Sequence, residues 1–230
     1  MFDDNGDMRI TKTKSTLKKK LQVENSARLV LPTNVAIVDG CAMLWVIPWP
    51  SSKGNVEHFI INVISYFNRL LQKCKTHIIF DRYYEQSTKN CTRKSRAGAV
   101  ASRQHQLTLT IPLLPQKVLL SVTENKVQLI DLIWKYQLSD SGTKLVVTGF
   151  LPVPLQFFRG NVTERHYLKT THEKADVIIV QRMVHLASKG IQTIKVICDN
   201  TDVFVLSVHY YSSEGLTCEV SMEGTREIYC

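Results

Sequence analysis

The hydrophobic pattern of the chain predicts short buried strands that alternate with amphipathic helices. Three apolar runs that contain β-branched residues, 35–38, 77–80 and 194–198, are typical of strands buried on both faces of a parallel sheet. Apolar residues also recur at helical spacing over 56–74 and 175–187. Strands and helices in this order and at these connection lengths predict right-handed βαβ units. We therefore expect an α/β fold with a mostly parallel central sheet flanked by helices.

The remaining segments are less regular, and they indicate how the chain is divided. We expect a basic helical segment at 83–106, a second helix at 123–137, a short strand at 145–147 and a proline-containing loop at 149–154. The expected organisation is a flexible basic tail at 1–34, a single domain at 35–212 with a basic helical insertion at 82–140 after the second strand, and a C-terminal strand region at 213–230. Within that last region the strand sequence is expected at 225–229.

Length and composition are those of a globular protein. The 230 residues are 44% hydrophobic, enough for one large domain or two small ones. No apolar run approaches the roughly 20 residues of a membrane span, and the N-terminus lacks a signal-like stretch, so we expect an intracellular protein without a membrane partner. The six cysteines show no zinc spacing; Cys74 and Cys198 are expected to be small buried residues. Glycine-rich phosphate-binding motifs are missing, so no nucleotide cofactor is expected.

The positive charge is concentrated in two windows. The net charge is +9; residues 1–34 carry seven basic and four acidic side chains, and residues 82–103 carry six basic and one acidic. Such clustering favours a polyanionic partner, with nucleic acid ahead of an anionic membrane surface. The alternative is a solubilising tail together with a solvated helix face.

Acidic residues follow each of the three expected core strands. Asp39 follows the first strand, Asp81 the second, and Asp199 with Asp202 the third. Because ligands bind at the carboxyl ends of the strands in open α/β sheets, these side chains are expected at one edge. Glu173 and Asp176 stand at the start of the last long helix, three residues apart, and are expected to share a helix face.

An all-oxygen ligand set of this kind suits a hard divalent cation. Crowded carboxylates repel one another unless a cation neutralises them, and Mg²⁺ or Mn²⁺ prefers oxygen ligands. Two such ions would activate water and stabilise the leaving oxygen in phosphodiester hydrolysis. The alternative is structural, because aspartates after strands commonly form turns or cap helices.

The four motifs together resemble a known family. Val-Asp-Gly at 38–40, Ile-Ile-Phe-Asp-Arg at 78–82, His-Glu-Lys-Ala-Asp at 172–176 and Asp-Asn-Thr-Asp-Val at 199–203 resemble the PIN-like nucleases. The resemblance is to the flap-endonuclease branch and to uncharacterised transposon-associated animal proteins, over about 35–210. It implies cleavage of structured or single-stranded nucleic acid that depends on Mg²⁺ or Mn²⁺, with two ions. The metal ligands it implies are Asp39, Asp81, Glu173, Asp176 and Asp202, to which we add Asp199.

The resemblance also implies a nucleic-acid-binding surface. Flap endonucleases place a basic helical gateway where this chain has Lys89, Arg93, Lys94, Arg96 and Arg103. We expect DNA ahead of RNA as the partner, and the nucleus ahead of the cytoplasm.

Two departures from the family pattern favour a second hypothesis. Asn200 stands where related sequences have an acid, which lowers the expected metal affinity. Family members also continue beyond the position of Cys230 into a segment with a further aspartate and a helical DNA-binding element, so the chain is expected to be truncated. The second hypothesis is therefore a degenerate PIN-like domain that binds nucleic acid or protein without cleaving it.

Overall fold

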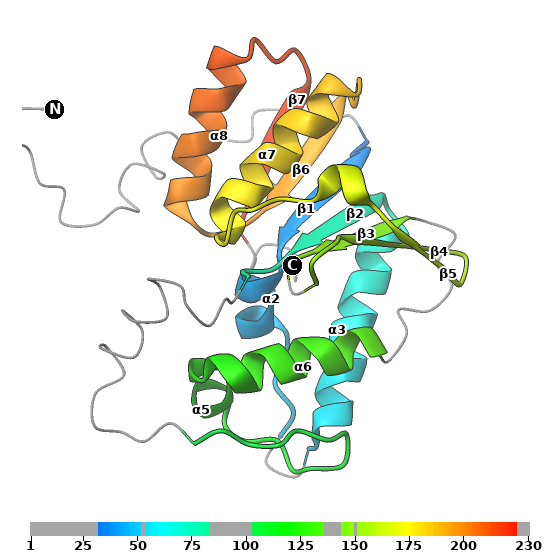
Figure 1. Cartoon of the computed structure of the whole chain (residues 1–230), viewed down its shortest axis with the longest axis vertical. Coiled ribbons are helices and arrows are strands. Elements are labelled where there is room, and N and C mark those ends of the chain that lie inside the picture. The colour runs from blue at the N-terminus through cyan, green and yellow to red at the C-terminus, as the bar shows by residue number, and fades with distance from the viewer. Residues whose placement is uncertain (1–31, 52–53, 83–102, 136–143, 150, 225–230) are drawn as a thin grey trace, which may run out of the picture.

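A seven-stranded sheet forms the centre of the molecule (Figure 1). The computed structural model describes residues 32–51, 54–82, 103–135, 144–149 and 151–224. The strands are β1 (Val35–Asp39), β2 (Lys75–Ile79), β3 (Leu145–Thr148), β4 (Leu155–Phe158), β5 (Asn161–Glu164), β6 (Thr193–Ile197) and β7 (Glu219–Glu223). They lie in the order β5-β4-β3-β2-β1-β6-β7, and all neighbours are parallel except the β3–β4 and β4–β5 pairs. The expected α/β class with a mostly parallel sheet is confirmed.

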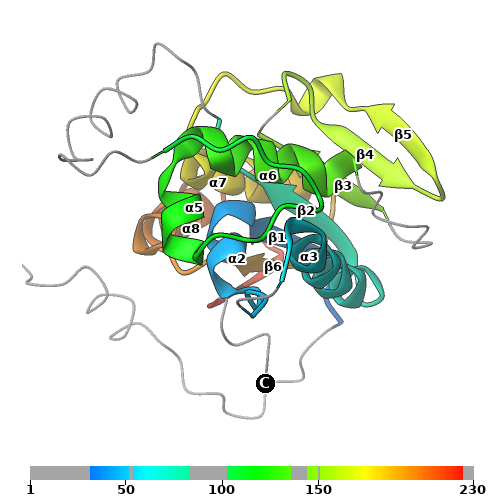
Figure 2. The ribbon, with the colours of Figure 1, turned by 90° about the horizontal axis from the view of Figure 1, so that it is seen from below.

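Helices cover both faces of this sheet. They are α2 (Gly40–Val46), α3 (Val56–Leu71), α5 (Gln116–Ser121), α6 (Thr123–Lys135), the 3-10 helix η1 (His166–Leu168), α7 (Ala175–Ser188) and α8 (Thr201–Ser213). Side chains of β1 alternate between two cores: Ala36 and Val38 join the core with α2, α3, α5 and α6, whereas Val35 and Ile37 join the core with α7 and α8. In Figure 2, α6 lies across the end of the helical layer that it forms with α2, α3 and α5, and the β4–β5 hairpin projects away from that layer.

The α3 helix shows how local sequence builds the first layer. Asn55 caps it: its side chain accepts from the backbone N–H of His58, and the His58 ring accepts from the backbone N–H of Asn55. These two bonds satisfy backbone donors that the first turn leaves without helical partners. Val56, Phe59 and Ile60 then begin a stripe with no exposed surface. The cap and the stripe together orient α3 against the sheet.

The order of connections creates a topological switch point at the carboxyl ends of β1 and β6. From β1 the chain adds β2 and β3 on one side, and later returns to add β6 and β7 on the other. The chain after β1 enters α2 on one face, whereas the chain after β6 enters α8 on the opposite face. Such a switch point is where open α/β sheets bind ligands.

One local expectation is wrong, and another lies outside the described residues. Residues 103–106 do not form the end of a helix, because α6 side chains hold this segment: Asn125 accepts from the backbone N–H of His105 at 2.8 Å, and Gln128 donates to the His105 carbonyl at 2.9 Å. The C-terminal strand pairs with β6 at 219–223, earlier than expected, and residues 225–229 lie outside the described part. No helix in the described part of the chain is long and apolar enough to cross a membrane.

Gly149 allows β3 to end directly against the end of β2. Its φ of 128° lies in the range that favours glycine, and a Cβ atom there would stand 2.2 Å from the Phe80 carbonyl oxygen. Phe80 precedes Asp81, and its N–H donates to the Thr148 carbonyl at 2.8 Å. The absence of a side chain at Gly149 therefore determines where Asp81 lies.

We expect Gly149→Ala to destabilise the protein more than Gly190→Ala does. Gly190 has a φ of 80° but nothing within 4 Å of an added Cβ, so Gly190→Ala carries only the backbone strain of about 1–2 kcal/mol. Gly149→Ala adds a collision with backbone, and its loss is expected to exceed that of the control by at least ~1 kcal/mol. Urea unfolding of both variants measures the difference; equal losses would contradict the close approach.

Candidate functional site

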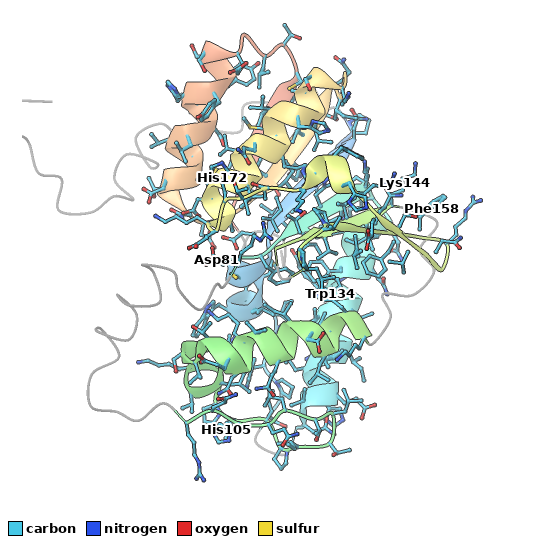
Figure 3. The ribbon with its side chains drawn as sticks, in the orientation of Figure 1. Asp81, His105, Trp134, Lys144, Phe158 and His172 are labelled. Carbon is cyan, nitrogen blue, oxygen red and sulfur yellow. The ribbon has the colours of Figure 1, made fainter. Side chains whose placement is uncertain are left out.

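The carboxyl edge of the sheet gathers acidic side chains from separate elements. In Figure 3, Asp81 lies at this edge, between α2 and the start of α7. Asp39 is the last residue of β1 and Asp176 lies in the first turn of α7. We name Asp39, Asp81 and Asp176, together with Asn200, the acidic edge.

Asp39 is the buried member of the acidic edge. Its side chain is 8% exposed; Oδ1 accepts from the Ala42 N–H at 3.0 Å and so caps α2. Oδ2 accepts from the Cys198 thiol at 3.5 Å, and this bond joins the end of β1 to the residue that follows β6. Burial raises the pKa of Asp39 above its ordinary value; the two hydrogen bonds oppose this, and the charges of Asp81 and Asp176 add to it.

Asp81 links the end of β2 to the start of α7. Its Oδ1 accepts from the Ala175 N–H at 2.9 Å, at the amino end of that helix. The next residue, Arg82, strengthens the link: its backbone N–H donates to the Glu173 carbonyl at 2.8 Å, and its guanidinium donates to the Thr170 carbonyl. A carboxylate at a helix amino terminus is favoured by the helix dipole and by the unpaired N–H groups there.

Asp176 and Asn200 meet across the α7–α8 boundary. The Asn200 amide donates to Asp176 Oδ1 at 2.8 Å, while its own oxygen accepts from the Asp202 N–H at 2.9 Å and caps α8. Asn200 therefore presents its amide nitrogen toward the acidic edge. A carboxylate here would instead repel Asp176 in the absence of a cation.

The other predicted site residues lie differently. Glu173 is not on the same helix face as Asp176, because α7 begins only at Ala175; that expectation is wrong. Asp199 and Asp202 are both exposed, as is Arg103, which lies in an extended segment. Figure 3 shows His105, two residues after Arg103, at the opposite end of the helical layer from Asp81. Lys89, Arg93, Lys94 and Arg96 lie outside the described residues.

Two cysteines belong to the surroundings of the acidic edge, although no motif pointed to a functional role for them. Burial, with a smaller contribution from the charges of Asp81 and Asp39, raises the pKa of the Cys41 thiol to about 11. The pKa of Cys198 is also raised, by burial and then by Asp39. Both side chains therefore remain neutral thiols at pH 7. The only available signal for Cys198 was its position at a strand end, directly before Asp199.

The donor chemistry of the acidic edge suits a hydrated hard cation. Within the described ranges, no group of three or more His, Cys, Asp or Glu side chains is arranged so that it could hold a metal ion. Mg²⁺ usually retains several waters and is held by one or two carboxylates. Burial is the main cause of the raised pKa of Asp39, and the charges of Asp81 and Asp176 add to it; a divalent cation would oppose both effects. A cation at the acidic edge would therefore have to be held by one or two of these carboxylates and by water.

In comparisons with known proteins, no protein family, no curated protein and no solved structure matches the chain. Functional inference therefore depends on the geometry of the acidic edge.

We expect Asp39→Asn to raise the melting temperature at pH 7 in the absence of divalent cations. A raised pKa in the folded state means that Asp39 stabilises the fold at low pH, and that this stability is lost as the pH rises and the side chain ionises. Asn can still accept from the Ala42 N–H. Each kcal/mol gained corresponds to about 2–4 °C in a chain of this size.

A melting series from pH 4 to pH 8 measures the effect. The gain should shrink toward pH 4, where Asp39 in the parent becomes protonated. Asp131→Asn, an exposed change that removes only the pair with Lys135, is the control and should not raise the melting temperature. A lower melting temperature for Asp39→Asn at every pH would contradict the unfavourable burial of this charge.

Proposed function

We propose that the acidic edge binds Mg²⁺ or Mn²⁺ and that the protein hydrolyses phosphodiester bonds in structured or single-stranded nucleic acid, as PIN-like nucleases do. The observation that carries the proposal is the convergence of Asp39, Asp81 and Asp176, from three separate elements, at the switch point of the sheet. The net charge of +9 supports a polyanionic substrate. DNA ahead of RNA and a nuclear location remain part of the proposal.

In this proposal the residues of the acidic edge have distinct roles. Bound ions would activate water and neutralise charge on the scissile phosphate. Asp81 and Asp176 would supply half-buried carboxylates, and the Ala175 N–H keeps Asp81 in place. Asp39 would strengthen the attraction of the site for a cation, because burial of its negative charge is unfavourable without a nearby positive charge.

A second candidate function is nucleic-acid or protein binding without cleavage. It is favoured by the contacts that already occupy the acidic edge: the Asn200 amide donates to Asp176, and both Asp39 oxygens accept protein hydrogen bonds. In this case the carboxylates act as helix caps, and the basic residues act on a bound partner.

We expect Mn²⁺ to raise the melting temperature of the parent protein, and Asp81→Asn and Asp176→Asn to lose this response. Binding at a hundred-fold excess over Kd contributes about 2.7 kcal/mol, or roughly 5–10 °C. Both substitutions remove a charge but retain an oxygen that can accept the existing hydrogen bond. Asp131→Asn, on the exposed face of α6, should respond as the parent does.

The same proteins should differ in cleavage of labelled flap, single-stranded and duplex substrates. Metal-dependent cleavage by the parent and by Asp131→Asn, reduced at least 100-fold in Asp81→Asn and Asp176→Asn, would support the nuclease. The order of magnitude follows from losing electrostatic stabilisation of the transition state. No cleavage, together with equal and salt-sensitive binding by all four proteins, would support the second function.

We expect Asn200→Asp to lower stability without metal and to increase the stabilisation by Mn²⁺. The substitution replaces an amide donor 2.8 Å from Asp176 by a like charge, which costs about 1–3 kcal/mol. A cation would relieve that repulsion and gain a ligand. Melting temperatures with and without Mn²⁺ measure both effects. A variant that loses stability and gains no metal response would count against a cation at this position.

A further inference from the structure

Arg182 is a buried cation for which the described residues provide no acidic partner. It lies in the middle of α7, faces the sheet and is 3% exposed. Its guanidinium donates to His77 Nδ1 at 2.7 Å and to Thr148 Oγ1 at 3.1 Å, and in the described part of the chain no carboxylate forms an ion pair with it. Burial lowers the pKa of Arg182 to about 10, so it is still charged at pH 7. Burying an uncompensated charge is strongly unfavourable.

The other ring nitrogen of His77, Nε2, is a second buried polar atom with no hydrogen-bond partner among the described residues. A guanidinium has only donors, so His77 Nδ1 must accept, and the ring proton of the neutral imidazole must lie on Nε2. His77 is 2% exposed, and no acceptor among the described residues lies within hydrogen-bond distance of Nε2. Burial and the Arg182 charge lower the pKa of His77 well below its ordinary value, so the ring stays neutral. Its Nε2–H is a buried donor that requires an acceptor.

A cavity of ≈ 440 Å³ opens beside His77. Its polar lining comes from Lys75, His77, Tyr167, His185 and Lys189, and three apolar side chains complete its wall. A smaller adjoining hollow, with Tyr167 and His185 in common, is lined by Arg182. Neither contains an acidic residue. The pKa of Lys75 is lowered by burial and then by the charges of Lys144, Arg182 and Arg165, which shows that positive charges crowd this region.

The cavity is separate from the acidic edge. Lys75 begins β2, whereas Asp81 follows the carboxyl end of the same strand. His185 and Lys189 likewise lie at the end of α7, whereas Asp176 is in its first turn. The inference that follows therefore does not depend on the proposed nuclease function.

We propose that this cavity binds a small phosphate-bearing anion, held by Lys75, Lys189 and the His77 Nε2–H and neutralising Arg182. A phosphate has several strong acceptor oxygens and up to two negative charges, and so matches two ammonium groups, a buried guanidinium and a neutral donor better than a single carboxylate does. The volume is in the range of small-molecule sites, and the apolar wall with Tyr167 can pack against an organic group attached to the phosphate.

Isothermal titration of the full chain at constant ionic strength tests the proposal. The probes are inorganic phosphate, adenosine 5′-monophosphate and adenosine. We expect saturable binding of one phosphate or one monophosphate per chain, and none of adenosine. Tighter binding of the monophosphate would identify an organic phosphate as the ligand, and equal binding would identify phosphate itself. No saturable binding of either phosphate probe would overturn the proposal.

A matched pair of double variants identifies the site. Lys75→Gln with Lys189→Gln removes two charges at the cavity and should weaken phosphate binding at least about tenfold, as expected for charge-assisted bonds. Lys117→Gln with Lys135→Gln removes two exposed charges from α5 and α6 and should bind as the parent does. Both changes are at partly or fully exposed side chains, so both proteins should fold. Equal weakening in the two variants would show a general charge effect and refute the cavity as the site.

Discussion

The parallel pairing of β1 with both β2 and β6 is the constraint on which the rest of the structure depends. All five residues of β1 are buried, and its register with β2 places Asp39 opposite Ile79, whereas Val38 lies opposite Ile197 of β6. A shift of one residue would exchange the two cores, because strand side chains alternate between faces. This register therefore fixes the two layers of helices and also brings the end of β1 to the switch point.

Hydrogen bonds to the first turns of α2 and α7 explain how the fold accommodates carboxylates at the switch point. Asp39 accepts from the Ala42 N–H at the start of α2, and Asp81 accepts from the Ala175 N–H at the start of α7. These bonds favour the ionised side chains and join each strand to a helix. They do not balance the burial of Asp39, whose pKa remains raised. Structural capping and cation binding are therefore compatible roles for the same residues, since the caps orient the carboxylates and leave a net negative charge.

The periodicity of apolar residues was sufficient to predict the strands and helices whose own sequences show a clear buried face. It predicted β1, β2, β6, α3 and α7; Asp39 and Asp81 were expected at the edge of the sheet from their positions after strands, and Asp176 from its position at a helix start. Periodicity failed where tertiary contacts determine the local structure. Residues 103–106 are held by hydrogen bonds with the side-chain amides of α6, and the half-buried strand β7 has a polar sequence. Arg182 was not among the predicted site residues, which were acidic at the edge of the sheet. It falls on the apolar stripe of α7, between Ile178 and Leu186. A charged residue on a buried stripe was the available signal.

Helix α7 carries the buried cation Arg182 and begins at the acidic edge, and in the part of the chain that the structure describes neither Arg182 nor Asp39 forms an ion pair. Asp176 in the first turn and His185 in the last turn are both placed as the helix dipole favours, but that effect fades within one turn and does not reach Arg182 in the middle. No carboxylate contributes to the pKa of Arg182, and the largest charge effects on Asp39 come from Asp81 and Asp176. Arg182 is not among the charges that shift the pKa of Asp39, and Asp39 is not among those that shift the pKa of Arg182. A cation at the acidic edge and an anion at the cavity are therefore two separate proposals.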